Sequence, residues 1–94
     1  MWCIARTNAR RYTFPINLKN LEGGISVSDE EVKKTIIFLS EHLKIVVEPG
    51  GAVAVAALLN KKINVKNKKI VVMISGGNID LDLFSSLWVK YLIY

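Results

Sequence analysis

The sequence has a single cysteine, Cys3, among its 94 residues. One cysteine cannot form an internal disulfide, so it excludes a disulfide-stabilised secreted scaffold and suits a reducing compartment, the cytoplasm. The sequence also lacks any apolar run near the roughly 20 residues that a membrane-spanning helix needs. The longest run, Gly51–Leu59, ends in the polar residues Asn60–Lys62. We therefore expect a cytoplasmic protein with no membrane partner.

Metal ligands and clustered positive charge are also scarce. His42 is the only histidine, and no group of histidine, cysteine and carboxylate residues has the spacing of a metal site. We expect His42 at the surface, in the last turn of a helix. The net charge is +5, but the lysine-rich stretch from Asn60 to Lys69 has no interleaved aromatic residues. A solvated loop is the preferred interpretation of this stretch, and nucleic acid is not an expected partner.

Much of the positive charge belongs to the N-terminal end of the chain. Residues 1–20 contain four basic residues and no acidic one, so the rest of the chain is nearly neutral. Residues 1–11 show no apolar period, and we expect a solvated terminus with Cys3 as an inert thiol. A transit peptide is the less favoured alternative, because no long amphipathic pattern is present. The chain as a whole is 51% hydrophobic, a composition typical of a packed domain.

The best-marked element is a helix from about Asp29 to Leu43. Ser28 precedes it, and Glu31 follows Ser28 by three residues, which is the arrangement of a capping box. Apolar residues then recur at helical spacing, and we expect them to form a buried stripe. The members of this stripe are Val32, Ile36, Leu39 and Leu43.

Three further helices are predicted. A short one begins near Pro15, and a second begins with Pro49 in its first turn and continues through Ala52–Leu59. The last runs from Asp80 to about Ile93 and has an apolar stripe of its own. We expect that stripe, which includes two aromatic residues on one helical face, to lie in the core rather than to form a ligand cage. Its members are Leu81, Phe84, Leu87, Trp88 and Tyr91.

Short apolar segments between the helices are predicted to be strands: Ile25–Val27, Ile45–Val47 and Ile70–Ile74. The alternation of strands and helices predicts an α/β fold with a mainly parallel sheet. Ile70–Ile74 is apolar at every position, so both faces of the sheet should be covered there and Met73 should be buried. Too few helices are available for such a cover, and we expect the chain to be part of a larger sheet, either as a fragment or with a partner chain.

Polar residues and paired glycines follow two of these predicted strands. Ser75–Asn78 comes directly after the strand that ends at Ile74, and Glu48 precedes Gly50 and Gly51. In open α/β sheets, ligands bind beyond the carboxyl ends of strands, so the two ends are candidates to converge on one ligand. The plainer interpretation, two glycine-rich turns without a ligand, stays open at this point. The glycine spacing excludes a dinucleotide fingerprint and a Walker loop.

Four blocks of the sequence resemble, in order and at similar spacing, the C-terminal part of the serine/threonine dehydratases. These are pyridoxal-phosphate (PLP) enzymes of fold type II, a group that includes serine racemase. The resemblance covers about residues 12–90. It implies that residues 12–94 form part of a three-layer α/β sandwich, a partial dehydratase-like PLP domain, and leaves residues 1–11 unmatched. The blocks are TFPI (13–16), ISVSDEEVKKTI (25–36), EPGGAVAVAALL (48–59) and VVMISGGNIDLD (71–82).

The resemblance implies roles for the residues after the strands. Ser75 matches the serine whose hydroxyl hydrogen-bonds the pyridine nitrogen of PLP, and Glu48 matches a glutamate near the cofactor ring. Gly76, Gly77 and Asn78 match the turn that holds the serine. A neutral hydroxyl partner suits β-elimination better than transamination. The implied reaction removes the α-proton and the β-hydroxyl of serine or threonine and releases a 2-oxo acid and ammonia.

Two motifs of the family do not occur in the sequence. One is the Ser-x-Lys-x-Arg-Gly segment that carries the Schiff-base lysine, and the other is the serine-and-glycine loop that binds the cofactor's phosphate. We therefore expect no catalytic residue in this chain, poor binding of PLP by the chain alone, and no activity without the remaining enzyme portion. That portion, or self-association, is the expected partner. The alternative is a non-catalytic interaction module that keeps the fold.

Overall fold

The computed structural model describes residues 11–93. Within them the chain forms four helices, and none is long and apolar enough to cross a membrane. The predicted N-terminal segment, with Cys3, lies outside the described residues except for Arg11. The helices are α1 (Thr13–Asn20), α2 (Asp29–Leu43), α3 (Pro49–Leu59) and α4 (Leu81–Ile93).

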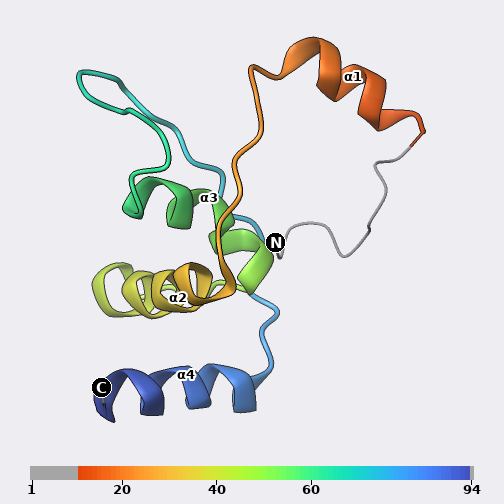
Figure 1. Ribbon diagram of the computed structural model, residues 1–94. Coiled ribbons are helices and arrows are strands. Elements are labelled where there is room, and N and C mark those ends of the chain that lie inside the picture. Colours follow the sequence, from red (N-terminus) through yellow and green to blue (C-terminus); the bar gives the residue numbers. More distant parts are fainter. Residues whose placement is uncertain (1–10, 94) are drawn as a thin grey trace.

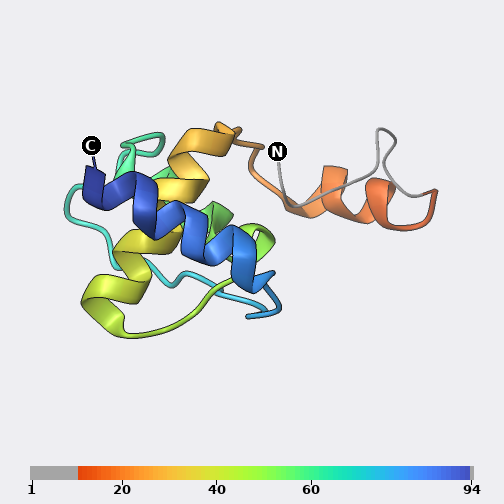
Figure 2. The same ribbon diagram turned by 90° about the horizontal axis from the view of Figure 1, so that it is seen from below.

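The helices form a small body around α2, which packs against both α3 and α4. Figure 1 shows α2 between the other two, and Figure 2 shows α4 crossing over it. Among the described helices, α1 packs on none and buries none of its residues. It lies apart from the body, at the far end of an extended segment (Figures 1 and 2).

All four predicted helices are confirmed. The helix expected near Pro15 begins at Thr13, and α3 begins at Pro49 itself. The last helix begins one residue later than expected, because Asp80 caps it. The Oδ1 atom of Asp80 accepts hydrogen bonds from the backbone N–H groups of Asp82 (2.8 Å) and Leu83 (3.1 Å).

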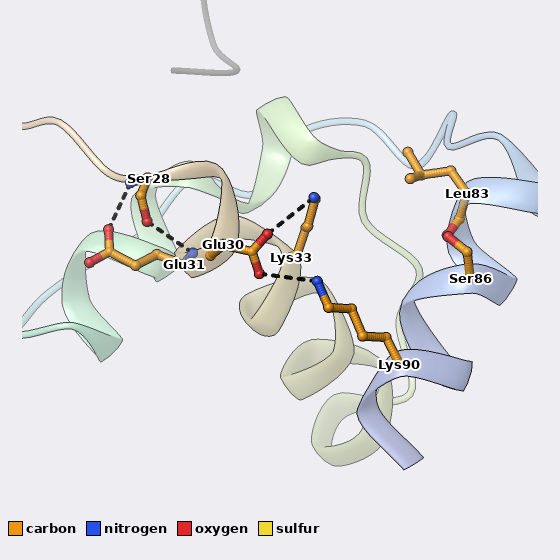
Figure 3. A network of polar contacts seen from close by, with 7 residues as sticks. All are labelled: Ser28, Glu30, Glu31, Lys33, Leu83, Ser86 and Lys90. Atoms are coloured by element: carbon orange, nitrogen blue, oxygen red, sulfur yellow. Dashed lines mark hydrogen bonds and ion pairs between the residues drawn. The ribbon is translucent and has the colours of Figure 1, made fainter. Parts of the chain in front are cut away.

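The predicted capping box of α2 is also confirmed (Figure 3). The backbone N–H of Glu31 donates to the hydroxyl oxygen of Ser28 at 3.2 Å, and the N–H of Ser28 donates to the Glu31 carboxylate at 2.8 Å. The same carboxylate lies 3.1 Å from the ammonium of Lys62, beyond the end of α3. Glu31 therefore both closes the first turn of α2 and links it to the chain that leaves α3.

The core lies where α2 meets α3. Val32, Ile36 and Leu39 of α2 are almost fully buried, and they face the small side chains Ala52 and Ala56 of α3. Small residues on α3 let the two helices approach closely, as the alanine-rich sequence indicates.

Three stripe residues lie outside this core, so their predicted burial is wrong. Leu43 is 57% exposed because α2 ends there and Lys44 turns the chain with a left-handed φ of 58°. Leu81 (77% exposed) and Tyr91 (49% exposed) lie near the two ends of α4. Among the described helices α4 packs only on α2, and Leu87 in its middle is the residue that this packing buries.

The predicted parallel sheet is not confirmed in residues 11–93, where the three expected strands are extended segments without a strand ladder. One backbone hydrogen bond joins the residues that follow two of them, from the N–H of Glu48 to the carbonyl of Gly76 at 3.1 Å. Val71 is 96% exposed and Met73 is 79% exposed. The predicted burial of Met73 is therefore wrong, because the described residues leave that side of the segment open.

The capping box predicts a stability effect. Replacing Ser28 with alanine should lower the free energy of unfolding by about 1 kcal/mol, because a backbone N–H of the central helix loses its acceptor. Urea unfolding followed by circular dichroism measures the change. Ser85→Ala is the matched control, since Ser85 is an exposed serine inside α4 and its removal should change stability by less than about 0.5 kcal/mol. Equal losses in both variants would contradict the role of the box.

Glu31 also predicts a pH effect. The backbone N–H of Ser28, and then the ammonium of Lys62, hold the pKa of Glu31 below its ordinary value of 4.5. A lowered folded-state pKa means that this stabilisation is present above pH 4.5 and is lost as the pH falls through the lowered value. Glu31→Gln should therefore make the urea midpoint less dependent on pH in the acid range. Glu22→Gln, in the exposed linker, should leave the wild-type slope unchanged.

Candidate functional site

The two glycine-containing turns predicted to carry a site lie against each other. The N–H of Glu48 donates to the carbonyl of Gly76. On the other side of the turn, Gly51 in the first turn of α3 lies against the backbone of Ser75. A Cβ atom at Gly51 would overlap the Ser75 carbonyl oxygen and lie only 2.9 Å from its carbonyl carbon. The structure thus brings Glu48 and Ser75 into one place, from segments more than 25 residues apart.

Glycine is required at the centre of this turn. Gly76 has a φ of +78°, a left-handed conformation that side chains disfavour. The carboxylate of Glu48 occupies the space beside its Cα, so that an added Cβ would lie 2.5 Å from the carboxyl carbon. At Gly77 a Cβ would lie 2.9 Å from the carbonyl oxygen of Val46. Both glycines therefore let the turn sit directly on the segment that carries Glu48.

The polar groups of the site differ in exposure. Ser75 and Asn78 are exposed, whereas Glu48 is half-buried. Although Glu48 is the residue before α3, its side chain makes no cap hydrogen bond to that helix and lies beside Gly76 instead. The next residue after the turn, Ile79, is buried and its N–H donates to the carbonyl of Gly77 at 3.0 Å. The turn is thus anchored on its inner side and presents a hydroxyl and an amide outward.

This set of groups fits one side of a PLP molecule. A serine hydroxyl can donate to a pyridine nitrogen or accept from its protonated form, so it suits the edge of the ring. A phosphate group calls for several N–H donors or cationic side chains, and the five residues of the site include neither lysine nor arginine. The described site, Glu48 and Ser75–Asn78, therefore fits the ring of the cofactor and supplies no cationic side chain for its phosphate.

The remaining candidates lie elsewhere. His42 is exposed in the last turn of α2, as predicted, with its ring 4.5 Å from that of Phe38. A groove between α2 and α4, about 760 Å³ in volume, includes His42 in its lining but none of the five site residues. In residues 11–93 no group of three histidine, cysteine or acidic side chains could hold a metal ion.

Sequence reasoning missed two contacts. The first is the close approach of Gly51 to the backbone of Ser75. The paired glycines predicted a turn, but not this contact. The other is a hydrogen bond, 3.1 Å long, that the Tyr91 hydroxyl donates to the Glu41 carboxylate. The two residues are 50 positions apart in the sequence, so no local pattern predicts the bond. The neighbouring carboxylate of Glu41 raises the pKa of Tyr91.

The chain belongs to the family of pyridoxal-phosphate dependent enzymes, whose family model matches residues 4–76. The resemblance stated above is thereby confirmed, and PLP is the cofactor of the family. Membership implies the α/β fold of type II, although the described residues do not form its sheet.

Curated relatives agree with this family. An L-threonine ammonia-lyase of Thermotoga maritima is 43% identical over 86% of this chain, which is 20% of the relative. An L-threo-3-hydroxyaspartate ammonia-lyase of Saccharomyces cerevisiae is 40% identical over 81% of this chain and 23% of its own length. A serine racemase of Dictyostelium discoideum is 37% identical over 86% of this chain and 26% of its own length.

The chain thus spans about a fifth to a quarter of the curated relatives that it matches. No solved structure matches it significantly. The match to the family model begins at residue 4, and the predicted division of the chain after residue 11 stays a prediction.

The close contact at Gly51 predicts a cost for any side chain there. Gly51→Ala should lower the free energy of unfolding by about 1–3 kcal/mol, because the new Cβ meets the Ser75 backbone rather than a movable side chain. Gly24→Ala is the matched control, since a Cβ at Gly24 would meet nothing within 4 Å. Denaturant unfolding measures both variants. If Gly51→Ala were as stable as Gly24→Ala, the close approach of α3 to the turn would be contradicted.

Proposed function

We propose that this chain forms the ring side of the cofactor site in a PLP-dependent ammonia-lyase of the serine/threonine dehydratase type. The observation that carries the proposal is the contact of the Ser75–Asn78 turn with Glu48, made through Gly76, and with the first turn of α3, made through Gly51. It gathers from two segments the five residues to which the family resemblance gives cofactor-binding roles. Further support comes from the names of the relatives, which are ammonia-lyases and a racemase.

In this proposal the Ser75 hydroxyl holds the pyridine nitrogen, and Gly76, Gly77 and Asn78 fix its position. Bound PLP supplies an electron-withdrawing system that weakens the Cα–H bond of an amino acid. Ser75 is neutral, so it orients the ring without holding a full positive charge on the nitrogen. Glu48, half-buried beside Gly76, is placed to accept a hydrogen bond at its carboxylate oxygens near the same ring.

The substrates that we propose are small amino acids with a hydroxyl on Cβ, such as serine and threonine. The relatives' names include threonine, serine and threo-3-hydroxyaspartate, which share this hydroxyl. The proposed products are a 2-oxo acid and ammonia. Their formation requires a Schiff-base lysine and a phosphate-binding loop from a further enzyme portion, because the sequence has neither motif. A cytoplasmic location stays a prediction.

A non-catalytic interaction module is the second candidate. It is favoured by the exposure of apolar residues that a folded domain normally covers, among them Val71 (96%) and Met73 (79%). In this alternative the chain keeps the fold and uses its open surfaces to bind another protein, without PLP.

Native mass spectrometry of the untagged protein from its own source separates the two candidates. The proposal expects a complex with a larger chain that carries lysine-linked PLP. In that complex, Ser75→Ala should shift the absorption spectrum of the cofactor, because the ring nitrogen loses its hydroxyl partner, and should lower deamination of serine or threonine at least about tenfold, in line with the loss of one preorganised hydrogen bond.

Ser85→Ala is the control, because Ser85 is an exposed serine of α4 outside the candidate site, and it should alter neither the spectrum nor the rate. A monomer would overturn the proposal, and an assembly without PLP would overturn it in favour of the interaction module. An unchanged cofactor spectrum in Ser75→Ala would reject the role given to Ser75.

A further inference from the structure

The turn that carries Ser75 has little support from its own side chains. All four residues of the Ser75–Asn78 turn are exposed, and none of their side chains makes a hydrogen bond within residues 11–93. The segment before the turn is open as well, with Val71 96% exposed and Met73 79% exposed. The position of the turn therefore depends on backbone contacts and on the residues at its two ends.

Ile79, directly after the turn, is the buried residue of this part of the chain. Between Ala57 in α3 and Leu87 in α4 it is the only residue that is buried. It is 9% exposed and belongs to the same apolar core as the inner faces of α2 and α3. Ile74, directly before the turn, packs against this core but is only half-buried. The main apolar anchor of the turn is thus Ile79.

The backbone around Ile79 connects this anchor closely to the turn. The N–H of Ile79 donates to the carbonyl of Gly77 at 3.0 Å. On its other side, Asp80 caps α4 by accepting hydrogen bonds from the N–H groups of Asp82 and Leu83. Ile79 therefore lies between a helix cap and the turn, and both neighbours restrict its backbone.

Two contacts of the turn require it to lie at one depth against the rest of the molecule. The carbonyl of Gly76 accepts from the N–H of Glu48 at 3.1 Å, and Gly51 lies so close to the backbone of Ser75 that no Cβ would fit between them. A small outward shift of the turn would break this hydrogen bond. A buried isoleucine opposes such a shift, because moving it outward exposes apolar surface to water.

We propose that Ile79 is the positioning residue of the candidate site. Its side chain, buried in the core, sets the depth of the Ser75–Asn78 turn and thereby the place of the Ser75 hydroxyl. Because it is buried, Ile79 acts through the turn and not by contact with a ligand. The use of this hydroxyl at the ring nitrogen rests on the proposed function, and that use requires placement to within about 0.5 Å.

Amide hydrogen exchange of the purified full chain, followed by NMR, tests the anchoring. In Ile79→Ala the Glu48 amide, which binds the carbonyl of Gly76, should exchange at least about tenfold faster than in the wild type, because opening of the turn then exposes less apolar surface. Leu87→Ala is the matched control. Leu87 is 7% exposed in the same core but lies in α4, eight positions further along the chain. Its removal lowers overall stability without releasing the turn, so the Glu48 amide should exchange much more slowly than in Ile79→Ala.

A second pair of variants keeps the test valid if circular dichroism shows that Ile79→Ala is unfolded. Ile79→Val and Ile37→Val each remove one methyl group from a buried isoleucine, a change small enough to preserve the helices. The Glu48 amide should exchange about two- to tenfold faster in Ile79→Val and at the wild-type rate in Ile37→Val. Equal exchange of this amide within the pair that is measured would overturn the proposal.

The cofactor complex of the proposed function gives a separate measurement. In that complex Ile79→Ala should shift the absorption spectrum of PLP in the same direction as Ser75→Ala, because the hydroxyl is displaced, and Leu87→Ala should leave the spectrum unchanged. An unshifted spectrum in Ile79→Ala beside a shifted one in Ser75→Ala would overturn the positioning role. The exchange experiment needs no PLP, so a failure there and a failure of the proposed function are distinguishable.

Discussion

The structure depends on the near absence of side-chain bulk along one side of α3. Gly51 lets the backbone of Ser75 lie against the first turn of this helix, and the fully buried Ala52 and Ala56 let α2 pack closely along it. A larger side chain at any of these positions would push apart the elements that meet there, because a packed interior has no room for added atoms. The packing of α2 on α3 and the position of the candidate site therefore both depend on the small residues of α3.

Features that neighbouring residues determine were predictable from the sequence. Ser28 and Glu31 marked the start of α2, and Pro49 marked the start of α3, because both signals act within one helical turn. The meeting of Glu48 with the turn at Ser75 was also foreseeable, since polar residues after parallel strands collect at one edge of a fold. The contact of Gly51 behind that turn was not, because a pair of glycines marks a bend and does not say which backbone will approach it.

Burial was harder to predict, because it depends on segments that are remote in sequence. Leu43, Leu81 and Tyr91 continue helical apolar stripes, yet all three stay exposed, although the Tyr91 hydroxyl reaches Glu41 of α2. The same holds for the predicted sheet. The segment Ile70–Ile74 has the composition of a strand covered on both faces, but within residues 11–93 only one backbone hydrogen bond joins its neighbourhood to the segment that carries Glu48. Its sequence indicates a cover that residues 11–93 do not provide.

The exposure of Met73 has a chemical consequence. A thioether that is 79% exposed is open to peroxide, whereas the same group under a neighbouring strand or helix is shielded from it. The only other methionine is Met1, so Met73 is the sole internal residue of its kind. The extent of its conversion to the sulfoxide therefore reports how exposed the extended segment is. It distinguishes a chain whose segment is open from one whose segment has been covered by any partner.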